Sequence, residues 1–374
     1  MKTYVDSSET SVALDEQDEF SEKLLYADTV DNTTQRLSIM DLSQMQSFPS
    51  YYFPSKGVSY SFGWAWQGAS TASNIVMLNE SLERGFYIYL FDRSLELGDD
   101  TVLIYMSTCV KDVNARENLL VASEKIGYSL VKENDAVMLF KLQNAPDTFG
   151  VVTDYKGIAI GKSAQLITLE FPYFKEGNSY ALDEYSFDEL KGYEKIYLSG
   201  FTYTNREKAE ALVNKLSEAG VKVYIDMNSI PYDNLTNRQK FLGVTSQVIA
   251  FEESFGKLTF NDQDIYADIF FSQDKPWNTV YLDNLDNVNG YGIVDSKKLA
   301  FYGTKNNKNQ IYIGFNLLYH FIQTDDSIVE DMLCNIFELD EDELPAREIV
   351  PLSVITVGDS ITIQSDYDHV NTTI

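Results

Sequence analysis

The fold of this chain is decided by residues 195–225, which read KIYLSGFTYTNREKAEALVNKLSEAGVKVYI. The two ends of this stretch are short, mainly apolar runs rich in β-branched and aromatic side chains, a pattern typical of buried strands. Between them, Thr204 and Glu207 match the capping box that starts a helix, and Gly220 supplies the end of that helix. A strand, a helix and a strand with short connections predict a right-handed crossover between parallel strands. The sequence therefore predicts an α/β domain whose parallel sheet is flanked by helices.

Changes in composition suggest the domain limits. Residues 1–34 are acidic and polar, and we interpret them as a linker or a loosely docked leader. Alternating strand-like and helix-like patterns then predict one α/β domain over residues 35–149 and a second over residues 150–337. Residues 338–374 begin with an acidic run and continue as two strands, so we expect a C-terminal β extension that returns to either domain. With 374 residues, the chain is long enough for two cores.

Local patterns in both domains give expectations that a structure can check. One apolar face predicts a single helix over residues 79–97, ended by Gly98. Two prolines bracket the aromatic segment 48–54 and predict a loop there. Further strands are expected over 36–42, 57–62, 101–106, 128–131, 136–142, 247–251, 257–260, 279–282 and 310–315, and further helices over 115–126 and 328–337.

The formal net charge of −28 restricts the partners. Nucleic-acid binding requires clustered Lys and Arg against the phosphates, so we exclude nucleic acid as a partner. Docking on anionic lipid is disfavoured for the same electrostatic reason. No apolar run reaches the roughly 18 residues that span a bilayer, and residues 1–4 lack the core of a signal peptide.

Two cysteines and two histidines restrict the chemistry. Cys109 and Cys334 exclude a disulfide framework, although one bridge between them stays open. His320 and His369 are too few for a multi-histidine zinc site, and we expect no metal. Because His320 lies in an apolar stretch, we interpret it first as a structural histidine.

Two loops resemble ligand-binding motifs but fail on their spacing. Residues 157–163, GIAIGKS, are one residue short of a phosphate loop, so the start of a helix is the better interpretation. In residues 283–290 the EF-hand pattern would place Leu285 and Ser296 at ligand positions, so we expect a polar turn there. We predict no cofactor.

Aromatic side chains cluster near the start of the first domain, in a chain with 25 Tyr and 22 Phe. Trp64 and Trp66 flank one residue and would point to the same side of a strand. Together with Tyr51 and Tyr52 they predict a glycan-stacking face, with a plug at a domain interface as the alternative.

The second domain has a candidate pocket at the carboxyl ends of its parallel strands, where ligands of such sheets bind. One strand is followed by Gly200 and Phe201, and its neighbour by Asp226 and Asn228. His320, from the later apolar stretch, is the fifth candidate.

Residues from about 156 to 323 resemble the class I glutamine amidotransferase-like fold. In that family the strand equivalent to residues 221–225 leads into a sharp elbow with the catalytic cysteine, whereas this chain has Asp226-Met227-Asn228. The family's histidine and glutamate lie two residues apart, and here Ile322 stands in the glutamate's place after His320. The resemblance implies a flavodoxin-like sheet without a nucleophile for thiol chemistry, so we assign no catalytic residue.

The chain as a whole resembles the extracytoplasmic region of bacterial membrane proteins described as 6-pyruvoyl-tetrahydropterin synthase-related. The resemblance is carried by residues 48–52, 60–69, 89–101, 198–202, 223–231, 237–244 and 313–320. Those proteins are similar to polytopic type C glycosyltransferases associated with exopolysaccharide or surface-glycan assembly. The resemblance implies a fragment on the extracytoplasmic face of the cell membrane, with a membrane-embedded parent chain. The low cysteine content fits a Gram-positive exterior as well as a cytosol.

Three classes of function follow. The leading hypothesis is a non-catalytic domain that binds a cell-surface glycan or a membrane-protein partner. The rival is a hydrolase or transferase that acts on glycans through a carboxylate pair, Asp226 with Asp41 or Asp92. The third is a structural assembly domain, which a large, dry interface between copies would identify.

Overall fold

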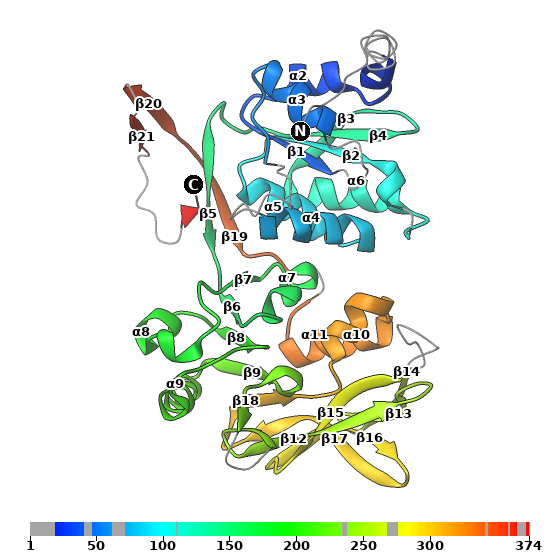
Figure 1. Ribbon diagram of the computed structural model, residues 1–374, viewed down its shortest axis with the longest axis vertical. Coiled ribbons are helices and arrows are strands. Elements are labelled where there is room, and N and C mark those ends of the chain that lie inside the picture. The colour runs from blue at the N-terminus through cyan, green and yellow to red at the C-terminus, as the bar shows by residue number, and fades with distance from the viewer. Residues whose placement is uncertain are drawn as a thin grey trace, which may run out of the picture. The chain divides into compact units, whose positions relative to one another are not determined.

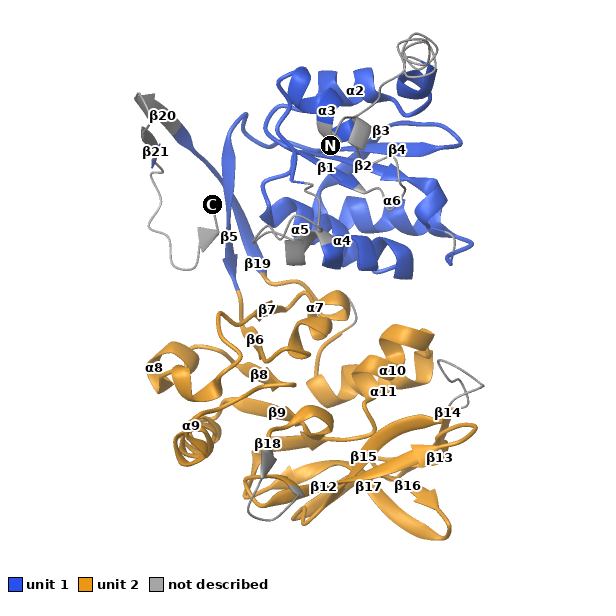
Figure 2. Cartoon of the chain, viewed as in Figure 1, with its two compact units in different colours: residues 1–154, 346–374 blue, residues 155–345 orange. Residues whose placement is uncertain are grey.

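The computed structural model describes residues 19–40, 47–61, 72–109, 111–233, 238–267, 276–340, 343–357, 360–364 and 372–373. The chain forms two compact units (Figure 2). Unit 1 comprises residues 1–154 and 346–374, and unit 2 comprises residues 155–345. Both units combine helices with sheets, so the predicted α/β class is confirmed.

Unit 1 is built on a mixed four-stranded sheet in the order β1-β2-β4-β3 (Figure 1). Its strands are β1 (Leu37–Met40), β2 (Thr101–Tyr105), β3 (Tyr128–Glu133) and β4 (Val137–Leu142). The β1–β2 pair is parallel, and the other two pairs are antiparallel. All five residues of β2 are buried, because both faces of the central sheet are covered.

Two hydrophobic clusters, one on each side of this sheet, hold unit 1 together. The helices are α2 (Tyr26–Asn32), α3 (Ser47–Ser55), α4 (Ala72–Arg84), α5 (Tyr87–Glu96) and α6 (Ala115–Ile126), with the 3₁₀ turn η3 (Met106–Thr108). Successive β2 side chains point to opposite faces. Val102 and Ile104 join the cluster with α4, α5 and α6, whereas Leu103 and Tyr105 join the cluster with α2 and α3.

Three local expectations for unit 1 were wrong. The proline-bracketed aromatic segment is helix α3, in which Phe53 is fully buried. The single helix expected over 79–97 is two helices, since Gly85 adopts a left-handed φ of +90° between α4 and α5. The strand expected over 57–62 is, in its described part, a single bridge between Tyr60 and Leu37.

The segment expected to be a loosely docked leader contributes to the core of unit 1. Tyr26, in α2, is fully buried, and its hydroxyl forms a 2.5 Å hydrogen bond with that of Tyr105. The acidic residues of the segment concealed this role, which rests on a few buried side chains, Leu24, Leu25 and Tyr26. The predicted domain boundary after residue 34 therefore differs from the limits of unit 1, which includes residues 1–34.

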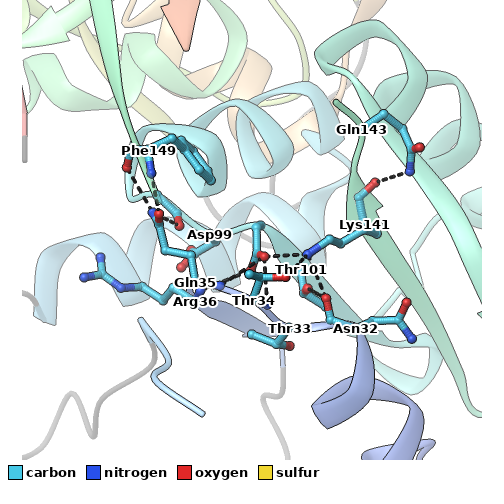
Figure 3. A network of polar contacts seen from close by, with 12 residues as sticks. Asn32, Thr33, Thr34, Gln35, Arg36, Asp99, Thr101, Lys141, Gln143 and Phe149 are labelled. Atoms are coloured by element: carbon cyan, nitrogen blue, oxygen red, sulfur yellow. Dashed lines mark hydrogen bonds and ion pairs between the residues drawn. The ribbon is translucent and has the colours of Figure 1, made fainter. Parts of the chain in front are cut away.

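Asp100 anchors the segment that leads from α2 into β1. Figure 3 shows Thr34, Gln35 and Arg36 of this segment together with Lys141. Its buried carboxylate accepts hydrogen bonds from the backbone amides of Thr34, Gln35 and Arg36 at 2.9, 3.1 and 3.1 Å, and it pairs with the Lys141 ammonium. Bonds to a charged acceptor are stronger than those between neutral groups. This carboxylate therefore fixes the start of β1 beside β2.

A second sheet in unit 1 joins residues that are far apart in sequence, in the order β19-β5-β22. Its strands are β5 (Phe149–Asp154), β19 (Ala346–Pro351) and β22 (Thr372–Thr373), and β20 (Ser353–Val357) pairs with β21 (Ser360–Gln364) as a hairpin. In the antiparallel β5–β19 pair, Asp154 lies opposite Ala346. The C-terminal β extension thus returns to unit 1.

Unit 2 contains five adjacent parallel strands in the order β7-β6-β8-β9-β18. They are β6 (Gly157–Ile160), β7 (Phe174–Glu176), β8 (Lys195–Leu198), β9 (Lys222–Asp226) and β18 (Asn307–Ile313). Helix α9 (Arg206–Glu218) connects β8 to β9, which confirms the predicted strand–helix–strand unit. The N-cap is Asn205, whose side chain accepts from the Lys208 amide at 3.0 Å, and not the predicted Thr204.

Beyond β18 the same sheet continues with antiparallel strands in the order β17-β15-β12-β11-β10, and β13, β14 and β16 attach through β17. These strands are β10 (Tyr232–Asp233), β11 (Arg238–Phe241), β12 (Val244–Phe251), β13 (Gly256–Phe260), β14 (Gln263–Ala267), β15 (Trp277–Asp283), β16 (Asn287–Val294) and β17 (Lys297–Lys305). The sheet of unit 2 is therefore mixed, and the expectation of a purely parallel sheet holds for one part of it.

Helices complete the core of unit 2. They are α7 (Ile167–Glu170), α8 (Phe187–Leu190), α10 (Leu317–Thr324) and α11 (Ser327–Phe337), with the 3₁₀ turns η4 (Ala164–Leu166), η5 (Leu182–Glu184) and η6 (Met227–Ser229). The predicted inner face of α9 is confirmed, because Ala209, Leu212, Val213 and Leu216 are buried in the main cluster. In the ranges given above, no helix is long and apolar enough to cross a membrane.

Candidate functional site

The candidate pocket lies where β6, β8 and β9 end. The loops after β6 and β8 are joined there, because the amides of Lys162 and Ser163 donate to the carbonyls of Gly200 and Ser199 at 3.1 and 3.2 Å. Gly161 has a φ of +120°, and a Cβ on it would lie 2.2 Å from the Ser199 carbonyl oxygen. The glycines thus allow two backbones to approach each other, and the space between the loops is filled.

Asp226 ends β9 and is the only carboxylate among the five candidate residues. Its Oδ2 accepts from the Ser199 hydroxyl at 2.8 Å and from the Tyr197 hydroxyl at 3.4 Å. Its Oδ1 accepts from the Asn228 amide at 2.9 Å and from the Asn228 side chain at 2.6 Å. A carboxylate has about four acceptor positions, and this one uses four.

Asn228 extends the same network to the antiparallel part of the sheet. Its Oδ1 accepts from the Thr279 hydroxyl at 2.7 Å and from the Val280 amide at 3.3 Å. Burial raises the pKa of the Asp226 carboxyl, and the hydrogen bonds from Asn228, Ser199 and Tyr197 oppose that shift. The network therefore connects β8 and β9 to β15 (Trp277–Asp283), with its polar groups already paired.

The other two candidate residues lie in apolar surroundings. Phe201 is 1% exposed, and its ring centroid is 5.1 Å from that of Phe241. His320 is fully buried in α10 among aromatic rings, with Phe255 at 4.8 Å and Trp277 at 5.2 Å between ring centroids.

The His320 imidazole connects two helices. Its Nε2 lies 3.3 Å from the Oδ2 of Asp326, whose other oxygen caps α11 by accepting from the Ile328 amide. Burial lowers the pKa of His320, and Asp326 opposes the shift. These contacts give His320 a structural position between α10 and α11, as its apolar sequence context indicates.

The predicted glycan-stacking residues divide into two groups. Trp64 and Trp66 lie outside the described residues. Tyr51, in α3, is 73% exposed, whereas the Tyr52 ring is half-buried against Tyr26, with 5.3 Å between centroids. Only Tyr51 of the described pair presents most of its surface to a ligand.

Unit 1 contains a buried ion network that sequence reasoning missed. Arg347 of β19 places Nη2 2.7 Å from Asp92 and 3.3 Å from Glu96, both on α5. The three side chains are 10%, 5% and 6% exposed. Burial raises the pKa of Asp92 to about 7, an effect that the Arg347 guanidinium opposes. The sequence offers no signal for this contact, because 255 residues separate Arg347 from Asp92.

Another buried carboxylate of unit 1, Asp99, lies in the turn between α5 and β2. Its Oδ2 accepts from the Ser61 hydroxyl at 2.8 Å, while its Oδ1 has no hydrogen-bond partner within the described part of the chain. Burial raises the pKa of Asp99 to about 7, and Ser61 and Arg36 oppose the shift.

Asp99 predicts how the stability of unit 1 depends on pH. Because the pKa of Asp99 in the folded chain lies above the ordinary value of 3.8, the folded state binds more protons than the unfolded state between about pH 4 and 7. The free energy of unfolding should therefore fall as pH rises through this window, by up to about 1.4 kcal/mol per pH unit for this one carboxyl. Asp99→Asn should reduce the slope. Urea unfolding at pH 5 to 8 measures this slope. The unfolded fraction is read by alkylating the buried Cys109 in a short pulse at one common pH.

The matched control for this pH dependence is Asp147→Asn, which changes an exposed carboxylate of the same unit. It should leave the slope as in the unmodified chain. An equal change of slope in both variants would show that general charge repulsion, and not Asp99, sets the pH dependence.

The described cysteine, histidine and acidic side chains are dispersed over the two units. Among the described residues, no group of three or more His, Cys, Asp or Glu side chains could hold a metal ion. Cys109 and Cys334 lie in different units and are not joined by a disulfide. In the polar segment 283–290, Asp286 pairs with Lys305 at 2.9 Å and accepts from the Asn306 amide, which are the contacts of a turn between strands.

The fold and the site together define a two-unit α/β protein. At the candidate pocket of unit 2, where β6, β8 and β9 end, the polar groups are hydrogen-bonded to one another. Residues 21–154 match a family model described as "Domain of unknown function (DUF8559)", and residues 156–320 match one described as "Domain of unknown function (DUF8560)". The division between the two matches coincides with the passage from unit 1 to unit 2 at residues 154 and 155. No curated protein and no solved structure matches the chain.

Proposed function

We propose that this chain is a non-catalytic, extracytoplasmic domain of a membrane protein of surface-glycan assembly, and that it binds glycan through an aromatic surface of unit 1. The observation that carries the non-catalytic part is the bonding of Asp226. This carboxylate follows the strand where the related fold has its nucleophile, and four donors from its own unit already use its oxygens.

We also propose that unit 2 has a flavodoxin-like, amidotransferase-like arrangement. Counted along the chain from β6, its parallel strands lie in the spatial order 2-1-3-4-5. This order is typical of flavodoxin-like sheets, which bind ligands at the point between the first and third strands. In unit 2 that point lies between β6 and β8, where the loops containing Gly161 and Gly200 are hydrogen-bonded to each other. Because these hydrogen bonds join the two loops across the crevice, they support the proposal of a non-catalytic function.

The rival hypothesis, a glycan-active enzyme, needs two carboxylates in one cleft, about 5–9.5 Å apart. Asp41 lies outside the described residues. Asp92 belongs to unit 1, where the Arg347 guanidinium encloses it, and Asp226 belongs to unit 2 with its own set of donors. Each described carboxylate is thus held in a structural network, which favours the binding hypothesis.

The aromatic surface is proposed from both sequence and structure. Tyr51 is exposed on α3, and Trp64 and Trp66 follow in the sequence with the spacing of one strand face. Flat rings cover the apolar faces of sugars, and exposed rings bury large areas when a ligand covers them. An aromatic surface also suits a chain of high negative charge, because stacking on a neutral sugar needs no basic side chains.

The proposal predicts that the paired substitution Trp64→Ala and Trp66→Ala weakens the binding of neutral surface-glycan oligosaccharides by at least about tenfold, because two stacking rings are lost. Titration calorimetry of the full chain with defined oligosaccharides measures this change. Tyr51→Ala should weaken binding to a smaller degree, since it removes one ring.

The control for the aromatic surface is Tyr266→Ala, which removes a 57% exposed ring from unit 2 and should leave binding unchanged. Mass spectrometry of the oligosaccharides after incubation tests the rival hypothesis, and we expect no products. Products that disappear in Asp226→Asn would replace the binding proposal with the enzyme, and an absence of glycan binding by the unmodified chain would also contradict it.

A further inference from the structure

Unit 2 has a cleft at the opposite edge of its parallel sheet, where β8 and β9 begin. The cleft has a volume of about 470 Å³ and is lined by residues 191–195, residues 219–222 and Glu338. We call it the lysine cleft, because Lys191, Lys195 and Lys222 supply three ammonium groups against the carboxylates of Glu194 and Glu338. The Lys191 ammonium is paired with the Asp188 carboxylate at 2.6 Å, which leaves Lys195 and Lys222 as the lysines at the strand ends.

Two of these lysines are placed side by side by the strand register. Lys195 begins β8, Lys222 begins β9, and the two are Cα partners in the parallel pair. Neighbouring strands lie about 4.8 Å apart, and partner side chains point to the same face. Two ammonium groups in this arrangement repel each other unless negative charge lies between or above them.

Glutamates of unit 2 supply such negative charge, because Glu343, Glu338 and Glu194 all raise the pKa of Lys195. The Glu338 carboxylate forms an ion pair with Lys222. Lys195 instead donates to the backbone carbonyl of Glu338 at 3.2 Å and lies over the Tyr173 ring, 4.8 Å from its centroid. No carboxylate of a described residue lies within 4.0 Å of the Lys195 ammonium. Burial lowers the pKa of Lys195, and the charge of Lys222 lowers it further, although nearby glutamates oppose the shift.

The rim of the lysine cleft leaves room for a ligand. A Cβ on Gly192 or Gly220 would have no atom within 4 Å, so the backbone at both turns is open. Tyr193 also lines the cleft, with the Lys175 ammonium 5.5 Å from its ring centroid. A ring beside several ammonium groups suits a compact ligand that has an anionic group and a flat apolar face.

We propose that the lysine cleft binds an anionic sugar group, through ion pairs from Lys195 and Lys222 and with Tyr193 beside the sugar ring. The anionic group is a carboxylate, as in a uronic acid, or a phosphate. Both make charge-assisted hydrogen bonds with ammonium groups. This inference is independent of the proposed aromatic surface, which lies in unit 1 and recognises neutral sugar faces.

The test uses the full chain with its lysines reductively dimethylated in ¹³C, a modification that keeps their positive charge. Inorganic phosphate, an oligogalacturonide and neutral maltotetraose are titrated separately at about 20 mM salt, where charge interactions are weakly screened. We expect the first two, and not maltotetraose, to shift the NMR signals of Lys195 and Lys222. The signal of Lys308, an exposed lysine on β18, should stay in place.

Two variants make the outcome decisive. The double variant Lys195→Gln and Lys222→Gln should weaken anion binding by at least about tenfold, whereas Lys195→Arg with Lys222→Arg, which keeps both charges, should retain it. A shift with the oligogalacturonide alone identifies a uronate ligand, and a shift with phosphate alone identifies a phosphate group. An absence of shifts, equal shifts at Lys308, or unchanged binding by the glutamine variant would overturn the proposal. Loss of Trp64 and Trp66 should leave these shifts unchanged, so the two proposals fail separately.

Discussion

Replacing Arg347 with methionine is expected to destabilise unit 1 by about 3–5 kcal/mol, because the change leaves the buried Asp92 carboxylate without its main counter-charge and removes one of the two cations beside Glu96. The guanidinium contacts Asp92 at 2.7 Å and Glu96 at 3.3 Å, and it also donates to the Asp92 carbonyl at 3.1 Å. Urea unfolding of the full chain, read by alkylation of the buried Cys109, measures the loss because Cys109 belongs to unit 1. A loss below about 1 kcal/mol would show that the network contributes little.

Two further variants separate charge burial from general damage. Arg116→Ala removes a 47% exposed arginine that pairs with Glu133, and exposed pairs contribute about 0–1 kcal/mol. The triple variant Asp92→Leu, Glu96→Leu and Arg347→Met replaces the network with apolar side chains, and it should recover much of the stability because no buried charge is left unpaired. If the triple variant is as unstable as Arg347→Met alone, the shape of the site and not its charge determines its contribution to the stability of unit 1.

Replacing Phe337 with alanine is expected to destabilise unit 2 by about 3–5 kcal/mol, as is typical when a buried phenylalanine is truncated. Phe337 ends α11, is fully buried, and contacts rings from three parallel strands. Its centroid lies 5.0 Å from Tyr224, 5.5 Å from Tyr197 and 6.0 Å from Phe174. Truncation would therefore open a cavity between the helix and the sheet. Alkylation of Cys334, in the same helix, during urea unfolding measures this change.

The matched control for this cavity lies nine residues earlier in the same helix. Ile328→Ala changes a side chain that is 39% exposed, and it should cost well under about 1 kcal/mol. Phe337→Leu should lie between the two, because most of the volume is kept. If Phe337→Ala and Ile328→Ala have similar effects, the aromatic contacts at the end of α11 are not central to unit 2.

The parts of the fold that follow from local pattern were predictable. The strands β8 and β9 and the inner face of α9 all lie within 32 consecutive residues, 195–226, and their apolar spacing is regular. Pairings between distant segments were not predictable in the same way. The sequence of β19 gives no sign that it pairs with β5, nearly 200 residues earlier, because antiparallel partners are selected by the completed core and not by either strand alone.

The same distinction applies to the candidate site. The position of Asp226 and Asn228 at the end of β9 could be read from the sequence, but the donors from Tyr197, Ser199 and β15 could not. The lysine cleft was missed because Lys195 and Lys222 look like unrelated surface residues until the register makes them neighbours. A search for like charges at the same position of consecutive parallel strands would have found them.

The pairing of Asp154 with Ala346 has a consequence for how the protein is made. All of unit 2 is inserted between two residues that face each other in one hairpin-like strand pair. The β19–β5 ladder therefore stays incomplete on the ribosome until the inserted residues have been synthesised, so unit 2 is fully translated before this part of unit 1 can close. Because the ends of an insertion that lie close together tolerate its removal, unit 1 is suited to expression alone, with a short turn joining residues 154 and 346.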